Sequence, residues 1–560
     1  MKKKFAIIVC VVLAVLIGSF LWVRGQIGIT DPARLLPENT AFYAALPDVP
    51  RTALRWPKTT LAKIGAEPEV KEFLAKTKDA LTKNPGTHEA GDILWKLKPG
   101  RFFAAALPGE GASLHPLLGF QYWGGQKSFD EAMARLRQQI AGGAHVEPTR
   151  ENHHNVEIQT LSLPDGTTLC SATLNRWGLL ANNPEALKSV LDQMAGRGSR
   201  PSLAENPRFN EAFTKLPAAP DFLAFLQTAP LLDALLEAGK PLSAQVDNDQ
   251  IEMVRAAQAV AFAFKLDGAN FRDAVFVLRP APPDLGQLHH SGLSLTSPAT
   301  LGYFSFLLQF EALAKLPAYS TLLRQYLSTM SDGTDPLTRL TKTLGREVSL
   351  AMSWPEGRMI PEFLAAVSVK DPAQASEFLR EAAAIFPEST RTKTGEAVLY
   401  SFPTLRSAFL DPTLGLSDNL LVAGLSPDAV EGAFQRGSGS STIKDTPAFA
   451  GVLPAFQSAN ECFGFINTRG LFERVFPLVR QVAMFGSSLL PGSSQWVDLK
   501  KLPQTETIAQ HLTPITYAQT RLPNGYLIES SGPITMNQAA LAAAGAGAAF
   551  WGPKLFPSHR

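Results

Sequence analysis

Cysteine is scarce in this sequence: a chain of 560 residues contains only Cys10, Cys170 and Cys462. Three cysteines are too few for the framework of a disulfide-stabilised secreted domain. No Cys-x-x-Cys pair, which would indicate a zinc or redox site, is present. Cys170 and Cys462 lie in apolar, strand-like segments. We therefore expect both to be buried and to act as small hydrophobic residues.

Charge is also low, since Asp, Glu, Lys and Arg make up 18% of the chain and the formal net charge is +2. A nearly neutral chain without extended basic runs argues against nucleic acid or an acidic polymer as a partner. Catalytic motifs such as Gly-x-Ser-x-Gly, His-Glu-x-x-His and the phosphate-binding loop are missing. We therefore predict no catalytic residues, no metal ligands and no cofactor, although a Ser-His-Asp set defined by geometry alone stays open.

The N-terminus carries the one long hydrophobic run. Lys2, Lys3 and Lys4 precede 19 uncharged residues, Phe5 to Val23, and Arg24 follows. Such a run matches the apolar thickness of a bilayer, and the lysines favour a cytoplasmic N-terminus. A cleavable signal peptide is the alternative, but no small-x-small cleavage site follows the run. We expect a single-pass protein of the bacterial inner (cytoplasmic) membrane with most of the chain periplasmic or extracytoplasmic.

The rest of the sequence contains an internal repeat. "GLLANNPEALKSVL" (178–191) and "LVAGLSPDAVEGAF" (421–434) share a strand-like run, a polar turn ending in proline, and a helical pattern. Aligned positions at similar spacing continue on both sides of this motif: Tyr43 with Tyr303, Pro184 with Pro427, Phe209 with Phe449, and Phe225 with Phe465. Each copy ends in a predicted hairpin, with Asp267–Gly268 or Asn524–Gly525 at the turn.

Strands interspersed with amphipathic helices predict an α+β fold class. We expect an N-terminal transmembrane helix followed by two tandem homologous domains, each a largely antiparallel sheet packed with helices. The expected divisions are the anchor at 1–25, a first repeat domain at 35–280, a Pro-rich linker at 281–296, a second repeat domain at 297–534, and an Ala/Gly-rich tail at 535–560.

Histidines provide the strongest candidate for a metal site. "ENHHNVE" places His153 and His154 between Glu151 and Glu157. On a strand, adjacent histidines point to opposite faces and cannot bind one ion without a bend. The equivalent stretch of the second copy has no histidine. We therefore interpret this segment as a solvated strand entrance, and His289–His290 as exposed residues of the linker.

Aromatic residues gather in "LLGFQYWGG" (117–125). Alternation places Phe120 and Tyr122 on one side and Trp123 on the other. Sheet core is the favoured interpretation, and a stacking surface for a glycan or peptide is the alternative.

The opening "LLPENTAFYAAL" (35–46), the strand–[Ser/Asn]-Pro-[Glu/Asp]-Ala–helix motif and the lone N-terminal anchor together resemble a family of uncharacterised bacterial envelope proteins, known as a domain of unknown function. The resemblance covers both copies, although Ser297 replaces the proline in the second opening. It implies a location and an architecture, and it brings no catalytic residues.

The function expected from these patterns is that of a membrane-anchored extracytoplasmic binding or scaffold protein without enzymatic activity. The sequence does not identify the partner, for which an envelope protein and a glycan are the candidates, and the charge argues against nucleic acid. The alternative is an extracytoplasmic hydrolase with its site in the cleft between the two repeats. A pocket with convergent titratable groups would favour the hydrolase, and an apolar groove without them would favour the binding protein.

Overall fold

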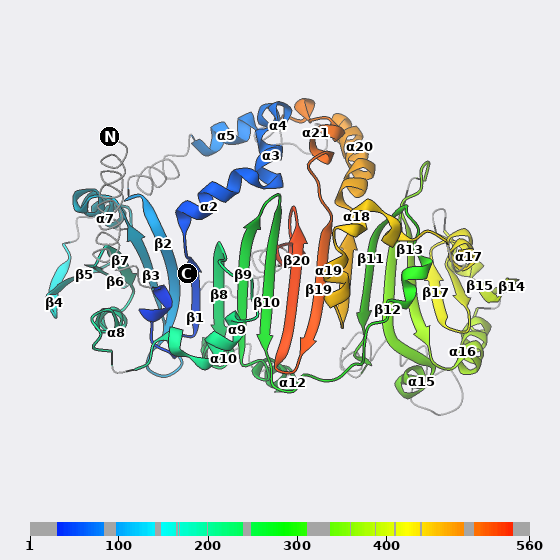
Figure 1. Cartoon of the computed structure of the whole chain (residues 1–560), viewed down its shortest axis with the longest axis horizontal. Coiled ribbons are helices and arrows are strands. Elements are labelled where there is room, and N and C mark those ends of the chain that lie inside the picture. The colour runs from blue at the N-terminus through cyan, green and yellow to red at the C-terminus, as the bar shows by residue number, and fades with distance from the viewer. Residues whose placement is uncertain are drawn as a thin grey trace, which may run out of the picture. The chain divides into compact units, whose positions relative to one another are not determined.

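The computed structural model describes residues 31–82, 97–140, 147–238, 248–310, 336–486, 498–540 and 542, except 164, 165, 167, 199, 359, 387, 408, 409 and 437–439. Its twenty strands belong to one large antiparallel sheet with helices (Figure 1). The expected fold class of two tandem domains, each with a sheet of its own, is therefore wrong. A strand at the end of a sheet presents unpaired N–H and C=O groups, and a sequence repeat does not reveal which strand will pair with them.

The transmembrane part of the expected fold also receives no support. None of the helices formed by the described residues is both long and apolar enough to cross a membrane. The predicted anchor at 1–25 and nearly all of the tail after residue 540 lie outside the described residues.

The strands fall into two sets of ten. The first set comprises β1 (Phe42–Leu46), β2 (Pro99–Pro108), β3 (Leu114–Tyr122), β4 (Thr149–His153), β5 (Val156–Ser162), β6 (Thr168–Leu174), β7 (Trp177–Ala181), β8 (Phe222–Gln227), β9 (Ala259–Asp267) and β10 (Asn270–Leu278). The second comprises β11 (Thr300–Leu307), β12 (Leu344–Ser353), β13 (Glu362–Val369), β14 (Thr390–Thr394), β15 (Ala397–Ser401), β16 (Thr413–Leu416), β17 (Leu420–Gly424), β18 (Cys462–Ile466), β19 (Ile515–Leu522) and β20 (Gly525–Gly532).

Helices connect the strands. The α-helices are α2 (Val49–Arg55), α3 (Thr60–Ala66), α4 (Pro68–Phe73), α5 (Ala75–Thr82), α7 (Gln126–Ile140), α8 (Pro184–Met194), α9 (Pro207–Phe213), α10 (Thr228–Ala238), α12 (Asn248–Arg255), α15 (Pro336–Thr343), α16 (Pro372–Ala384), α17 (Pro427–Gln435), α18 (Pro447–Ala450), α19 (Leu453–Ser458), α20 (Thr468–Gly486) and α21 (Thr505–Ala509). Short 3-10 turns are η1 (Pro32–Arg34), η2 (Trp56–Lys58), η3 (Leu203–Glu205), η4 (Ser291–Leu295), η5 (Pro403–Leu405), η6 (Ile443–Asp445) and η8 (Leu499–Lys501). The expected linker at 281–296 thus contains η4.

Both sets of strands pair in the same order. The first runs β4-β5-β6-β7-β3-β2-β1-β8-β9-β10, and the second runs β14-β15-β16-β17-β13-β12-β11-β18-β19-β20. The register agrees as well, because Tyr43 lies opposite Phe225 and Tyr303 lies opposite Phe465. The two sequence copies therefore follow one topological plan.

An aromatic group at the same place stabilises each copy. In the first copy, the rings of Phe209 and Phe225 lie 5.1 Å apart, and Tyr43 contacts Phe209. In the second copy, Phe449 and Phe465 lie 5.2 Å apart. Tyr43, Phe225, Phe449 and Phe465 are all almost completely buried. Burial of such large side chains is a principal source of stability, which explains why these positions recur at the spacing seen in the sequence.

The repeated proline motif marks the start of a helix. Pro184 and Pro427 each occupy the first turn, where a proline nitrogen leaves no hydrogen bond unmade. The preceding residues cap the helices: the Asn183 side chain accepts hydrogen bonds from the backbone N–H groups of Glu185 and Ala186 at 2.8 and 3.3 Å, and the Ser426 hydroxyl accepts one from Ala429 at 3.2 Å. The motif is therefore a structural signal.

The chain forms two compact units whose boundary differs from that of the sequence repeat. The second unit includes Lys58–Thr77 and Asp267–Ala274 as well as the residues from Ala281 onward. Within this unit the Glu67 carboxylate lies 2.6 Å from Nε2 of His511. The Glu69 carboxylate accepts a hydrogen bond of 2.7 Å from the backbone of Gln504. Helices α3 and α4 of the first sequence copy are thus bound to residues of the second.

Candidate functional site

Several residues singled out in the sequence have structural roles. Cys170 is buried, and Cys462 is partly buried with its thiol pKa raised to about 12, chiefly because burial disfavours the thiolate. Tyr122 is buried and stacks on Phe129 at 4.4 Å, which agrees with sheet core. His290 differs from the expectation of an exposed linker residue. Its ring stacks on Phe456 at 4.1 Å, and burial lowers its pKa to about 4, so it is a neutral packing residue.

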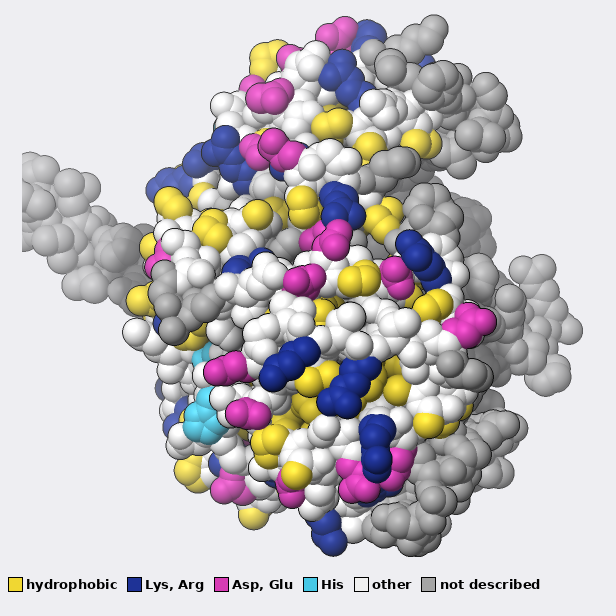
Figure 2. Space-filling model, turned by 90° about the vertical axis from the view of Figure 1, so that its right-hand side faces the viewer, with side chains coloured by type: hydrophobic (Ala, Val, Ile, Leu, Met, Phe, Trp, Pro, Cys, Tyr) yellow, Lys and Arg dark blue, Asp and Glu magenta, His cyan; other side chains and the backbone are white. Residues whose placement is uncertain are grey.

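The second unit contains an apolar pocket of about 480 Å³, which the sequence analysis did not predict. It is formed by strands β12, β13, β16 and β17 together with the segments that follow α16 and β15. Figure 2 shows a face of the molecule on which hydrophobic side chains gather in a hollow with lysine and arginine side chains beside it. The lining residues are Leu350, Phe363, Leu364, Ala365, Phe386, Phe402, Leu405, Pro412, Thr413, Leu414, Ala423, Gly424 and Leu425.

Two small residues open this pocket. Ala365 on β13 lies opposite Ala423 on β17, and the neighbours of this pair in the same row are Leu350 on β12 and Leu414 on β16. In the first copy, the equivalent pair across β3 and β7 is Leu118 and Leu180. The ends of the row differ too, since Ala104 and Ser171 flank the two leucines of the first copy. The second copy thus has small side chains in the middle of the row and large ones at its ends, the reverse of the first copy. The pocket is thus a local difference between two copies of one plan.

The pocket lacks the groups that perform acid–base or nucleophilic chemistry. None of the described residues that line it carries a titratable side chain. Its one hydroxyl, that of Thr413, is buried and donates a hydrogen bond of 3.1 Å to the backbone carbonyl of Asp411. Leu350, Phe363 and Leu405 remain 42%, 46% and 50% exposed at the mouth. Exposed apolar side chains around a cavity of this size are typical of a site for a hydrophobic ligand.

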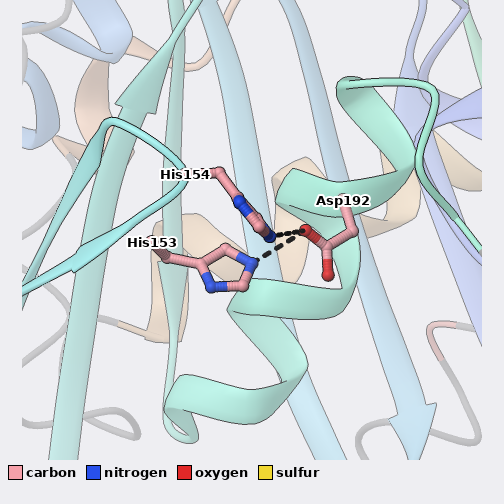
Figure 3. A group of neighbouring side chains, drawn as sticks. All are labelled: His153, His154 and Asp192. Atoms are coloured by element: carbon pink, nitrogen blue, oxygen red, sulfur yellow. Dashed lines mark hydrogen bonds and ion pairs between the residues drawn. The ribbon is translucent and has the colours of Figure 1, made fainter.

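His153 and His154 of the first unit come together around a carboxylate. Nε2 of His153 lies 2.8 Å from Oδ1 of Asp192, and Nε2 of His154 lies 3.8 Å from the same oxygen (Figure 3). The sequence interpretation assumed that both histidines continue a strand, and this assumption is wrong. His153 ends β4, whereas His154 and Asn155 form the two-residue turn to β5 with φ of +50° and +67°. This backbone turns both rings towards α8.

Glu151 and Glu157, the other two candidate ligands, are not part of this cluster. The Glu151 carboxylate pairs with Lys188 of α8 at 2.8 Å, and Glu157 pairs with Arg150 at 3.7 Å. The carboxylate beside the two histidines is instead that of Asp192, which lies 38 residues beyond His154 in the sequence. This neighbour becomes visible only when the β4–β5 hairpin is folded against α8.

These observations describe an antiparallel-sheet protein with a duplicated ten-strand plan and an apolar pocket in one copy. The family described as "Protein of unknown function (DUF3352)" has a model that matches residues 126–285. This match confirms the resemblance to an uncharacterised family. No curated protein matches the chain. A solved structure described as "Structure of crystal form I of TP0453" is similar over 73% of this chain and 98% of its own, at 8% identity and a TM-score of 0.18.

Proposed function

We propose that the protein is a non-enzymatic binding protein of the cell envelope that holds the aliphatic chain of a lipid-like ligand in the pocket between β12, β13, β16 and β17. The observation that carries this proposal is the apolar lining of a cavity of about 480 Å³, within the range of roughly 300–1,000 Å³ found for ligand sites. A glycan needs hydrogen-bonding partners, and the lining offers it none apart from Thr413. The chemistry of the pocket therefore favours a hydrocarbon ligand.

The expected affinity follows from the number of methylenes that the pocket buries. Each buried methylene contributes roughly 0.8 kcal/mol. Ten methylenes therefore contribute about 8 kcal/mol before the cost of immobilising the ligand is subtracted. Subtracting a cost of roughly 4 kcal/mol leaves about 4 kcal/mol, a dissociation constant in the millimolar range, so tighter binding requires that more than ten methylenes are buried. No charged group inside the pocket anchors a head group, so we expect chain length to matter more than head-group chemistry.

The experiment is a titration of the full chain in detergent-free buffer with a dansylated undecanoic acid, followed by displacement with unlabelled fatty acids and fatty alcohols. We expect one saturable site, with affinity that rises with chain length and is similar for acids and alcohols of equal length. Absence of saturable binding would refute the proposal. Displacement by a small glycan or hydrophilic peptide but by no aliphatic compound would refute it too. Release of fatty acid from an acyl ester would instead favour the hydrolase alternative.

The location belongs to the same proposal. The sequence of Lys2–Lys4, Phe5–Val23 and Arg24 supports export, with the bulk of the chain outside the cytoplasm. A reporter enzyme fused after Pro533 is expected to be active only when it reaches the extracytoplasmic side. Reporter activity confined to the cytoplasm would contradict this location, whatever the pocket binds.

A further inference from the structure

The second candidate site in the molecule is the cluster of His153, His154 and Asp192 in the first unit. One donor atom from each residue lies within 4.8 Å of the donors of the other two. With metal–ligand bonds of about 2.0–2.2 Å, ligand atoms around a tetrahedral zinc ion lie roughly 3.4 Å apart. The observed separations of 2.8 and 3.8 Å on either side of this value require only small side-chain rotations to admit an ion.

The backbone around the cluster is fixed by contacts that do not involve the three side chains. The Asn152 side chain accepts a hydrogen bond of 2.9 Å from the backbone N–H of Asn155, which holds the turn. Lys188 of α8 reaches Glu151 of β4 at 2.8 Å and so ties the hairpin to the helix one turn away from Asp192. Leu187, Val190 and Leu191 are buried and fix the helix on the sheet. These contacts therefore hold the backbone of the three donor residues in place without an ion.

The local charges favour a cation. The β4–β5 hairpin and α8 carry four carboxylates (Glu151, Glu157, Glu185 and Asp192) and two cations, Arg150 and Lys188. Both cations are paired with glutamates. Within the described part of the chain, the ion-pair partners of Asp192 are the two histidines alone. The carboxylate is therefore not neutralised by a lysine or arginine, and it is 68% shielded from solvent, being 32% exposed.

We propose that His153, His154 and Asp192 form a zinc-binding site. Two imidazoles and one carboxylate suit Zn²⁺ better than Mg²⁺ or Ca²⁺, which prefer oxygen ligands. Three protein ligands leave one coordination position for water or for a donor from another molecule. His153 is 20% exposed and His154 is 51% exposed, so the ion enters directly from solvent. The zinc joins the β4–β5 hairpin to α8.

The second copy supplies a matched variant. At the equivalent hairpin, Thr394 ends β14 and Gly395 occupies the turn with φ of +58°. Gln435 at the end of α17 stands in the place of Asp192. The variants His153→Thr with His154→Gly, and Asp192→Gln alone, therefore introduce side chains that the same fold already accepts. His289→Ala, which changes an exposed histidine of the second unit, is the control.

The test is equilibrium dialysis of the full chain against Zn²⁺ with elemental analysis, combined with the absorption spectrum of the Co²⁺-substituted protein. We expect the wild type to bind one zinc ion per chain and the double variant to bind none. The zinc affinity of Asp192→Gln should fall at least tenfold, while His289→Ala should bind zinc as the wild type does. The Co²⁺ protein should show tetrahedral bands that the double variant lacks. A wild type that binds no zinc, or a double variant that binds as much as the wild type, would overturn the proposal.

Discussion

Replacing Ala365 and Ala423 by leucine is expected to weaken binding of an aliphatic ligand to the full chain at least tenfold. These two side chains lie opposite each other on β13 and β17 and line the pocket. The added leucine side chains occupy the space that a ligand would fill, and a loss of about 1.4 kcal/mol already corresponds to a tenfold change in affinity. Titration with the dansylated probe measures the change directly.

The backbone accepts leucines at these two positions in the first copy, where Leu118 and Leu180 lie between the smaller residues Ala104 and Ser171. In the second copy the neighbour Leu350 is 42% exposed, so it has room to move outward. We therefore expect the thermal midpoint to stay close to that of the wild type. Ala373→Leu on the exposed side of α16 is the control, since it adds the same side chain outside the pocket lining. Wild-type affinity in a folded double variant would show that the aliphatic chain binds elsewhere.

Replacing Asp221 by alanine is expected to destabilise the first unit by about 3–5 kcal/mol, the range for breaking a buried ion pair. The Asp221 carboxylate, whose side chain is only 1% exposed, lies 3.0 Å from Arg55. It also accepts hydrogen bonds of 2.8 Å from the Thr52 hydroxyl and from the backbone N–H of Leu266. Removing it leaves a buried backbone donor and a guanidinium without their acceptor.

Amide hydrogen exchange of the β9 peptide, which contains Leu266, provides a local measurement. An increase of roughly two to four orders of magnitude in the exchange rate corresponds to the expected loss of stability. Asp221→Asn, which keeps an acceptor oxygen, should show a smaller increase. Asp233→Ala removes an exposed ion pair with Arg255 and should change exchange very little. Unchanged exchange in Asp221→Ala would contradict the role assigned to this carboxylate.

The same position in the second copy is also a buried acid. Glu461 precedes β18 as Asp221 precedes β8, and both aspartate and glutamate are nearly inaccessible to solvent. The partners differ, because Gln519 donates a hydrogen bond of 2.9 Å to Glu461 and Arg521 lies 3.5 Å away. Burial raises the pKa of Glu461 above its usual value. The repeat therefore includes an electrostatic feature as well as apolar packing.

The sequence was informative where the chemistry is local. Asn183 and Ser426 before proline predict helix starts, and the recurrence of Tyr43 and Phe225 as Tyr303 and Phe465 indicated equivalent positions that the structure pairs in the same register. Such features depend on neighbouring residues or on the comparison of two copies. A single sequence contains the neighbouring residues and, in this chain, both copies.

Features that depend on the pairing of distant strands could not be predicted. The pocket exists because Ala365 meets Ala423 across two strands, and this register is set only in the folded sheet. A sequence signal for the bend at His154 did exist, because asparagine tolerates the left-handed conformation that Asn155 adopts. The contribution of Asp192 had no such signal. The continuity of the sheet could not be seen either, because the repeat specifies the strands but not the neighbour of each edge strand.

The insertion of Lys58–Thr77 and Asp267–Ala274 into the second unit has a consequence for the history of the gene. A DNA fragment that encodes only the second repeat would omit Thr60, whose hydroxyl donates to the backbone carbonyl of His511 at 3.2 Å, and Glu67, the partner of the His511 side chain. Such a fragment would encode an incomplete fold. Deletion of the first repeat therefore also removes part of the second compact unit, and does not simply reverse the duplication.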